Sequence, residues 1–492
     1  MLFPSFVKML ANGVTYGVMA ATLVAVAVYA ITISRHMDIN SVKNFVSAKN
    51  STTTLRLAWC FFSAGIGAGS LFTFPEIGVS AGSWGIIGYS LSSITGMAVL
   101  ALVGPYIRSV VGENATMTDV VSRRFGYVMR LYIGCISVFY QFICLASEYT
   151  CVAQLTTMMS PNAHPIITIL LVAFLTNLYL TIGGLRASLA TDVWQGIGVV
   201  TLVFLVCIAM FFHVSIPDGE WSRTNVAAFT TEGFETLVTL VIAVTASNLF
   251  FTGFWQRVYA AYDDHTLHKA AFLAAVILCF FTVALAMAGL VSHLAYPEGD
   301  LFFAILIDMG RGWQVLIIIV IAMLASGVSD SLQIGIAAEL TTCFPKLTLL
   351  QARIICMVLN APAIAIGYQE YDIMTLYLIA DLLCTIAVGP MLLGIWKPAT
   401  RTGVLAGNAA GFLTVFVYGV IAQGKFVGGF NWFVLPEGLY SQNSMITFIV
   451  TLIIPPVVTV AVSLMTPENK DDGAYLLEHS PVVPEIQEAK PE

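Results

Sequence analysis

Charged residues are scarce in this sequence. Asp, Glu, Lys and Arg together make up only 10% of its 492 residues, whereas a soluble domain carries roughly 25%. Hydrophobic residues reach 58%, and the mean hydropathy is +0.88. Because a soluble fold of this composition would expose more apolar surface than water tolerates, the composition excludes a soluble protein. It indicates an all-α membrane protein with many spans.

Several signatures of catalysis and cofactor binding are also missing. The nine cysteines stand singly, without a C-x-x-C pair, which argues against a disulfide framework or a cysteine metal site. No basic tract is interleaved with aromatic residues, so nucleic acid is not an expected partner. The seven histidines lie at span ends, in loops or in the tail. We therefore expect no enzyme activity, no resident cofactor and no metal beyond a transported sodium ion.

Apolar segments of about 20 residues, the length that crosses a bilayer as a helix, recur along the chain. Thirteen are expected, centred near residues 22, 68, 95, 142, 173, 200, 246, 281, 324, 358, 384, 412 and 453. If the N-terminus lies outside, only Lys8, Arg223, Arg311 and Lys425 of the 21 Lys and Arg residues also lie outside. This bias predicts a multi-pass plasma-membrane protein, embedded in lipid, with a cytoplasmic C-terminus.

The second span looks built to break. The stretch "SAGIGAGSLFTFPEIG" (63–78) places Gly65, Gly67 and Gly69 in its middle and Pro75 beyond them. A bland alternative is that the glycines form a close-packing face against a neighbouring helix. Backbone freed from helical bonding is tolerated at this depth only where protein or a watery cavity satisfies it.

A matching interruption in the seventh span favours the break. That span, "TLVIAVTASNLFFTGFWQR", carries Ser247, Asn248 and Gly253. Paired interruptions in two five-span halves indicate an inverted-repeat transporter of the LeuT type, with its site at the midplane. The predicted units are a first span with a cytoplasmic loop, two inverted repeats, two C-terminal spans and a disordered cytoplasmic tail, at 1–56, 57–212, 213–400, 401–465 and 466–492 respectively.

Five acidic residues fall at membrane depth, where ionisable groups are expensive and are functional candidates. Glu76 could instead reach the outer interface, and Asp192 could cap the start of its helix. Glu148 and Asp381 could bond hydroxyls across helices as structural links. Asp330 is the strongest candidate because serines surround it.

The serines near Asp330 are Ser326, Ser329 and Ser331 in "LASGVSDSLQIG". Together with the carboxylate they offer the oxygen ligands that hard cations prefer. The same carboxylate could equally carry a proton. Both readings place a coupling cation in the ninth span.

The sequence "FTGFWQRVYAAYDD" places Trp255, Gln256 and Arg257 at the inner mouth of the seventh span. These residues could form an inner gate. They could also be an interfacial anchor, with an arginine that reaches toward the headgroups.

Over residues 10 to 465 the sequence resembles the sodium:solute symporter family, which includes proline, pantothenate, sugar and urea carriers. The resemblance rests on the glycine-broken second span and on four motifs in the expected order. These are "TDVVSRRFG" (118–126), "GGLRASLATDVWQ" (183–195), "FWQR" (254–257) and "SDSLQIGIAAELT" (329–341). It implies a thirteen-helix carrier with a five-plus-five inverted-repeat core and alternating access.

The resemblance also implies an ion site. The backbone carbonyls that hold sodium in the family fall on Ser63 and Ile66, and Asp192 matches an acid linked to cation coupling. The expected pair of hydroxyls, however, falls on Gly327 and Val328, so sodium and proton coupling both stay open. We assign cation coupling to Ser63, Ile66, Asp192, Ser326, Ser329 and Asp330.

The substrate site is expected between the two broken spans, at Gly67, Gly69, Ser70, Glu148, Ser247 and Asn248. Backbone and amide groups there suit a neutral or zwitterionic solute. The sequence therefore predicts cation-coupled symport of a small polar organic solute, such as urea or an amino acid. The alternatives are a passive uniporter or channel on the same fold, or a solute sensor that does not transport.

Overall fold

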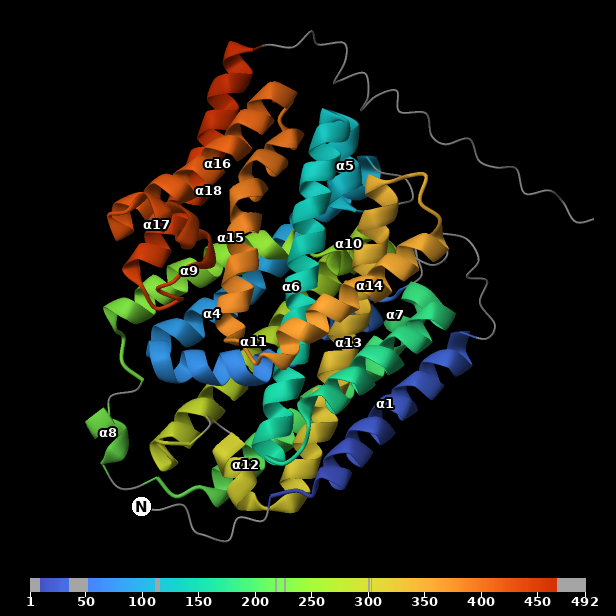
Figure 1. The fold of residues 1–492 in the computed structure, drawn as a ribbon, viewed down its shortest axis with the longest axis vertical. Coiled ribbons are helices and arrows are strands. Elements are labelled where there is room, and N and C mark those ends of the chain that lie inside the picture. The colour runs from blue at the N-terminus through green and yellow to red at the C-terminus, as the bar shows by residue number, and fades with distance from the viewer. Residues whose placement is uncertain are drawn as a thin grey trace, which may run out of the picture.

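The chain folds almost entirely into helices. The computed structural model describes residues 9–34, 52–110, 116–216, 219–224, 227–299, 301 and 303–466; the predicted first cytoplasmic loop and tail lie almost wholly outside these ranges. The helices, drawn in Figure 1, are α1 (Asn12–Ser34), α3 (Thr54–Gly65), α4 (Ser70–Val110), α5 (Met117–Phe125), α6 (Tyr127–Met159), α7 (Pro165–His213), α8 (Glu220–Thr224), α9 (Thr231–Asn248), α10 (Thr252–Ala260), α11 (Asp264–Ala295), α12 (Phe303–Met309), α13 (Arg311–Cys343), α14 (Leu349–Tyr368), α15 (Ile373–Leu392), α16 (Arg401–Gln423), α17 (Phe426–Asn431) and α18 (Gln442–Met465).

The number of membrane crossings follows from where these helices bend. Within the described ranges, eleven helical segments are long and apolar enough to cross a membrane, and α9 with α10 forms a twelfth, bent by 62°. α4 counts as one segment there, yet Gly82 interrupts it with φ 57° and ψ −147°, a backbone conformation open essentially only to glycine. Counted as two crossings, with α3 joined to the first, α4 brings the total to the thirteen that the sequence predicts.

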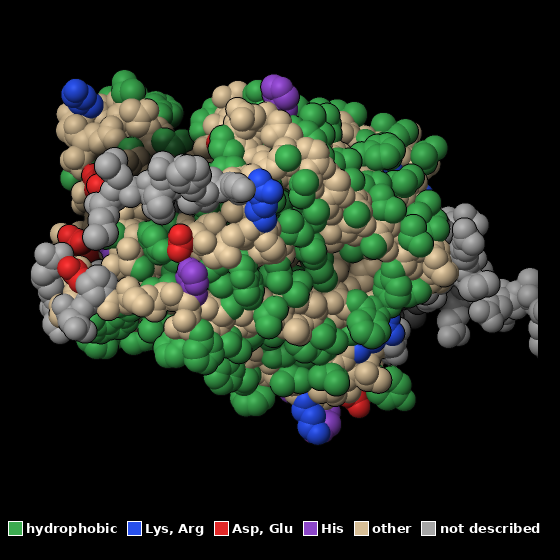
Figure 2. Space-filling model, turned by 90° about the horizontal axis from the view of Figure 1, so that it is seen from below, with side chains coloured by type: hydrophobic (Ala, Val, Ile, Leu, Met, Phe, Trp, Pro, Cys, Tyr) green, Lys and Arg blue, Asp and Glu red, His purple; other side chains and the backbone are tan. Residues whose placement is uncertain are grey.

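The surface of the bundle suits a lipid environment. Large apolar side chains such as Leu102, Phe174, Phe272 and Leu413 are exposed, and hydrophobic side chains cover much of the face in Figure 2. A single exposed apolar residue means little, but a continuous apolar surface fits the hydrocarbon core.

Consecutive crossings alternate in direction, which gives the bundle two ends. α5 and the turn between α10 and α11 lie at one end, called the α5 end below. α8, α12 and α17 lie at the other, called the α8 end. α4 packs along α9 and α11, α6 packs against α13, and α1 lies outside them against α7.

The second span breaks as predicted. α3 ends at Gly65 and α4 begins at Ser70. Between them the amide of Ala68 bonds a side chain and the amide of Ser70 bonds the Gly67 carbonyl. The carbonyls of Ala64 and Ile66 therefore lose the helical donors four residues ahead.

The seventh span breaks directly after Asn248. The Leu249 carbonyl accepts a hydrogen bond of 2.8 Å from the Trp255 indole, and the Phe250 carbonyl accepts one of 2.8 Å from the Ser137 hydroxyl. Side chains thus satisfy the freed carbonyls, as a break at this depth requires. The phenyl ring of Phe254 in α10 lies against Gly65, so the two breaks are neighbours.

Candidate functional site

One central cavity lies between the two breaks. Its volume is about 130 Å³, which is room for roughly four water molecules. Predicted substrate-site residues from both broken spans line it, namely Gly67, Ser70, Ser247 and Asn248. Aromatic rings form much of the remaining wall, from Phe74, Tyr89, Tyr140, Phe251, Phe254 and Tyr377.

Two carboxylic acids line the same cavity. Glu148 comes from α6 and Asp381 from α15, and both are buried. The Asp381 carboxylate lies beside the Ser247 hydroxyl. No Lys, Arg or His occurs among the cavity-lining residues that the structure describes. The cavity therefore offers two carboxyl groups to a ligand and no basic side chain. A cationic ligand would supply the countercharge that favours their ionised form.

Glu148 also holds the break in the second span. Its Oε2 accepts a hydrogen bond of 2.8 Å from the Ala68 amide, at the start of α4, where free amides and the helix dipole favour an anion. A side chain at Gly67 would overlap this carboxylate, so glycine is needed there for a close approach. Gly69 packs against Tyr377 and is not among the cavity-lining residues.

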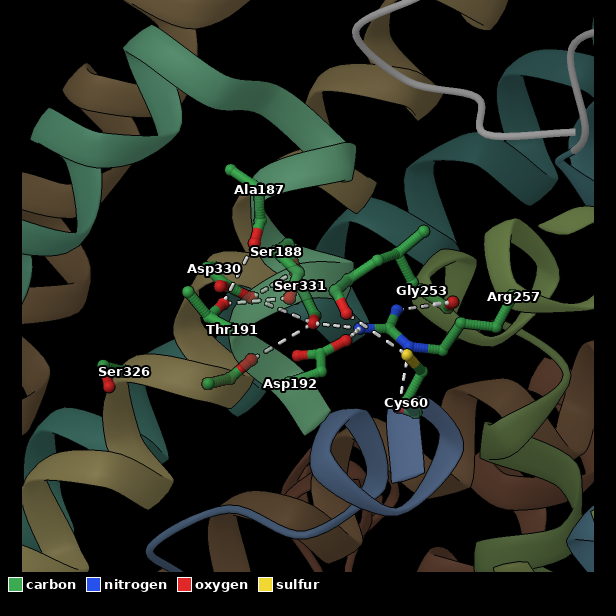
Figure 3. A network of polar contacts seen from close by, with 12 residues as sticks. Cys60, Ala187, Ser188, Thr191, Asp192, Gly253, Arg257, Ser326, Asp330 and Ser331 are labelled. Atoms are coloured by element: carbon green, nitrogen blue, oxygen red, sulfur yellow. Dashed lines mark hydrogen bonds and ion pairs between the residues drawn. The ribbon is translucent and has the colours of Figure 1, made fainter. Parts of the chain in front are cut away.

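Behind the cavity, a buried network centres on Arg257 of α10 (Figure 3). The guanidinium pairs with Asp192 Oδ2 at 2.6 Å, and both side chains are fully buried. It also donates to the Ser331 hydroxyl and to the carbonyls of Cys60 and Gly253, at 2.8 to 2.9 Å. Arg257 thus joins α3, α7, α10 and α13.

Asp330 is the second acid of this network. Its Oδ1 accepts from Ser188 at 2.8 Å and from Ser331 at 3.1 Å, and its Oδ2 accepts from Tyr179 at 2.9 Å. Ser331 therefore connects Asp330 to Arg257. Asp192 and Asp330 are two acids that share one arginine, so the network is one positive charge short when both are ionised.

The remaining predicted ion-site residues lie around this network. The Ser63 hydroxyl faces Asp192, and Ser326 accepts a hydrogen bond of 2.9 Å from the Gln195 amide. Ile66 lines the cavity. The Ser329 hydroxyl is buried and has no partner among the described residues, so it stands apart from the network.

Gln195 occupies the place where the family resemblance puts hydroxyls. A side-chain carbon on Gly327 would lie 3.1 Å from Gln195 Oε1 and 3.2 Å from the Ser63 hydroxyl. Gln195 Oε1 is buried and accepts no hydrogen bond from the described residues. Oxygens of Gln195 and Ser63 thus face the bare backbone of Gly327.

The predicted gate residues differ from an interfacial anchor. Every residue of α10 is buried, and Arg257 bonds inside the protein rather than reaching toward headgroups. Trp255 caps the break of its own span. Gln256 is buried, and neither its amide nitrogen nor its oxygen has a partner among the described residues. α10 is thus packed inside the protein between the cavity, which Phe254 lines, and the α5 end.

Three sequence expectations can be placed against this geometry. Asp192 lies more than two turns beyond the bend at Gly184 and pairs with Arg257, so it does not cap its helix. Glu76 lies outside the cavity and accepts from Tyr440 at 3.1 Å. Within the described residues, no group of three or more His, Cys, Asp or Glu could hold a metal ion.

Some contributors were missed by the sequence reasoning. Asp381 was singled out as an acid but not assigned to the site, and Tyr179, Ser188 and Gln195 were not considered. Ser188 and Gln195 both lie within the stretch 183–195 that carries the family resemblance, each about one turn from Thr191 and Asp192 respectively, and this proximity was the available signal. Tyr179 carried none, because a tyrosine in a span is usually packing.

Comparison with known proteins places this geometry among transporters. No family model matches the chain. A spermidine transporter of Candida albicans is 26% identical over 423 residues, which cover 82% of this chain and 80% of the relative. The chain is thus homologous to membrane transporters.

Solved structures confirm the fold. A sodium-coupled sialic acid symporter in its substrate-bound, outward-open state superposes with a TM-score of 0.70 at 14% identity, covering 93% of this chain and 99% of that one. Mhp1, a nucleobase-cation-symport-1 family transporter, gives a TM-score of 0.54 at 12% identity, covering 88% and 97%. The all-helical, LeuT-type architecture is therefore the fold of this chain.

Proposed function

We propose that this protein is a secondary active transporter that carries a small organic amine by alternating access, coupled to a cation. The observation that carries the proposal is the meeting of two broken spans at one central cavity, with α10 packed between that cavity and the α5 end. Such a cavity can bind a solute at mid-membrane and expose it to one side at a time.

The lining of the cavity favours a cationic substrate. Glu148 and Asp381 supply two carboxylates, and the aromatic rings around them attract cations through their faces. An anion would meet only repulsion, and a neutral solute such as urea would leave both carboxylates without a countercharge. The spermidine transporter among the relatives supports an amine. This proposal changes the expected solute from a neutral or zwitterionic one to a cationic one.

The charge at the α8 end supports the same substrate. We place the α8 end outside the cell. It carries many acidic and few basic residues. Its acidic residues include Glu220, Glu232, Glu298, Asp308, Glu370, Asp372 and Glu437. Acidic side chains gather toward the left side of the face in Figure 2. A negative potential raises the local concentration of cationic solutes.

The network behind the cavity supports cation coupling. Asp192, Arg257 and Asp330 are one positive charge short, and a proton or a sodium ion would complete the balance. For sodium, Gln195 and Ser63 would supply the oxygens that Gly327 and Val328 lack, beside the backbone of Ile66. For a proton, either carboxylate would suffice.

Transport by the purified protein in liposomes tests the proposal. With an imposed inward proton or sodium gradient, we expect radiolabelled spermidine to accumulate, whereas urea and a neutral amino acid do not. Accumulation of urea or the amino acid without spermidine would overturn the amine. Equilibration without accumulation would indicate a uniporter, and binding without flux would indicate a sensor.

A substitution at Asp330 tests the coupling separately. Asp330→Asn keeps the size of the side chain but removes its charge, so we expect gradient-driven uptake to be lost while expression is retained. Uptake that responds to both gradients as in the unsubstituted protein would remove Asp330 from the coupling mechanism.

A further inference from the structure

Another buried acid lies at the α5 end, in a place that neither the cavity nor the Arg257 network uses. Glu339 of α13 is 1% exposed. It follows Asp330 by nine residues, about two and a half helical turns, so it lies about 14 Å further along α13 and on the opposite face. The Arg257 network therefore cannot neutralise it.

Polar but uncharged groups surround Glu339. The Thr252 hydroxyl donates to its Oε1 at 2.7 Å, and the hydroxyls of Thr118 and Ser137 lie close to the same carboxylate. Gln141 Nε2 approaches Thr252 Oγ1 and Ser137 Oγ at 3.3 Å. These residues come from α5, α6 and α10, so the cluster joins three elements to α13.

The cluster contains more acceptors than donors. Glu339 Oε2, Gln141 Oε1 and Thr118 Oγ1 are buried without a hydrogen-bond partner of ordinary geometry among the described residues. Gln141 is fully buried, and its oxygen faces Gly335, one turn before Glu339, where a side chain would overlap it. Of these atoms only the Thr118 hydroxyl has a hydrogen to donate. One hydrogen cannot serve both oxygens, so the cluster is still one hydrogen short.

No countercharge reaches Glu339 within the described part of the chain. Ionisable groups near it include Asp119 of α5, another acid, and Cys343, one turn further along α13. Arg123 pairs with Asp119 at 3.6 Å, and the Arg130 guanidinium lies over the ring of Tyr127, 5.0 Å from its centroid. A buried carboxylate without a partner charge is expensive and takes up a proton instead.

We propose that Glu339 is a second proton-binding site, which holds a proton while the α5 end is closed and releases it when that end opens. The inference rests on the proposed transport function, since opening is a step of alternating access. Thr252 is the first residue of α10, and its bond to Glu339 ties the half-helix to α13. Loss of the proton leaves a bare charge in a dry site, which favours separation of α10 and entry of water.

Infrared spectroscopy tests the proton directly, without transport. In the protein reconstituted in lipid at neutral pH, we expect a carbonyl-stretch band of a protonated carboxylic acid that shifts on exchange into D₂O. Glu339→Gln should remove one component of this absorption, and any contribution from the buried carboxyl groups of Glu148 and Asp381 should remain. The matched control Glu235→Gln, a buried glutamate of α9 in the same broken span, should leave the Glu339 component unchanged.

Thr252→Val keeps the acid and tests its hydrogen bond. The variant removes the donor to Glu339 at nearly constant volume, so the band should move to higher frequency. Two results would show that Glu339 is not protonated at neutral pH. One is a carbonyl-stretch band that neither Glu339→Gln nor Thr252→Val alters. The other is a spectrum that contains only the bands of ionised carboxylates. These spectra require neither a gradient nor transport. They can therefore contradict the protonation of Glu339 while transport is observed, or support it while transport is not observed.

Efflux from liposomes tests release of the proton. With fixed pH at the α8 end, substrate efflux should rise as pH at the α5 end rises, by up to about tenfold per pH unit for one titrating group. Glu339→Gln should flatten this profile at the slow, low-pH rate. If Glu339→Gln leaves the pH dependence of efflux unchanged, Glu339 has only a structural role. If the substitution removes a dependence of efflux on sodium rather than on pH, Glu339 belongs to a sodium site.

Discussion

At the scale of single residues, charge in the cavity decides which solute binds. Glu148 and Asp381 face a space that contains no basic side chain among the described lining residues. A hydrogen bond to a charged partner contributes about 1.5–3 kcal/mol. Recognition of an amine should therefore depend on each carboxylate separately.

Neutralising either acid should weaken amine transport. For Asp381→Asn and Glu148→Gln we expect the KM for spermidine to rise by roughly 10- to 100-fold, the equivalent of one charged hydrogen bond. Glu76→Gln, on α4 outside the cavity, is the control and should leave KM unchanged. Initial uptake rates over a range of amine concentrations measure this, and unaltered KM values in both cavity variants would exclude an ionic substrate contact.

Residue identity predicted the acids but not their partners. Asp192 and Asp330 stood out in the sequence because carboxylates are rare at membrane depth. Their pairing through Arg257 and Ser331 depends on how α7, α10 and α13 pack, and no local spacing encodes it. Glu339 lies in the motif "SDSLQIGIAAELT", which supported the family resemblance, and it was not among the predicted site residues.

At the scale of elements, the broken spans depend on glycine. Ala substituted at Gly67 would overlap the Glu148 carboxylate that bonds the Ala68 amide. The sequence predicted both breaks from their glycines and polar residues, and the structure confirms them. It did not predict the 62° bend between α9 and α10, which arises from packing on α13 and α3.

Gly67→Ala should therefore destabilise the protein by about 1–3 kcal/mol, as overpacking does, and should abolish uptake. Gly17→Ala is a matched control, because a side chain at that position of α1 would meet nothing within 4 Å; it should keep full uptake. Thermal unfolding in detergent and uptake in liposomes measure both variants. Normal uptake by Gly67→Ala would show that the close approach is dispensable.

A polar contact joins the ends of α7 and α12 at the α8 end. His213 Nε2 lies 3.0 Å from Asp308 Oδ2, and the Tyr296 hydroxyl donates to the same oxygen at 2.8 Å. The hydrogen bond with His213 holds the pKa of Asp308 below its ordinary value. A carboxylate with a lowered pKa stabilises the fold above its unfolded pKa, and this contribution is lost as pH falls through the folded pKa.

Asp308→Asn should remove that part of the acid sensitivity. We expect its melting temperature to fall less than that of the unsubstituted protein between pH 5 and roughly pH 3, below the usual aspartate pKa of about 3.9. The effect should be small, because the carboxylate is partly exposed. Parallel melting curves over the pH series check this, and equal acid losses in the two proteins would count against the contact.

At the scale of the whole molecule, hydropathy predicted the thirteen crossings, and glycine predicted where two of them break. The substrate was harder to predict. Glu148 in α6 and Asp381 in α15 are separated by more than two hundred residues, so their shared cavity appears only once the bundle is assembled. The second and seventh spans by themselves offer backbone and amide groups, which favour a neutral solute.

The charge moved across the membrane in each transport cycle distinguishes a uniporter from a cation-coupled symporter. One charge crossing a potential of 100 mV gains about 2.3 kcal/mol, which corresponds to about 50-fold accumulation. A uniporter of a singly charged amine is limited to that ratio. Symport with one coupling cation moves two charges and permits about 2,500-fold.

Accumulation at a series of imposed potentials measures that charge. For an amine carrying one charge, we expect the logarithm of the accumulation ratio to rise with potential at twice the slope of a uniporter. In Asp330→Asn, if the variant still carries the amine passively, the slope should fall to that of one charge, because the amine then crosses without its cation. If the unsubstituted protein gives the slope of a uniporter, only the charge of the amine crosses the membrane in each cycle. The Asp192, Arg257 and Asp330 network would then balance its charge without a transported cation. That result would exclude cation coupling but would leave the assignment of an amine substrate to the cavity intact.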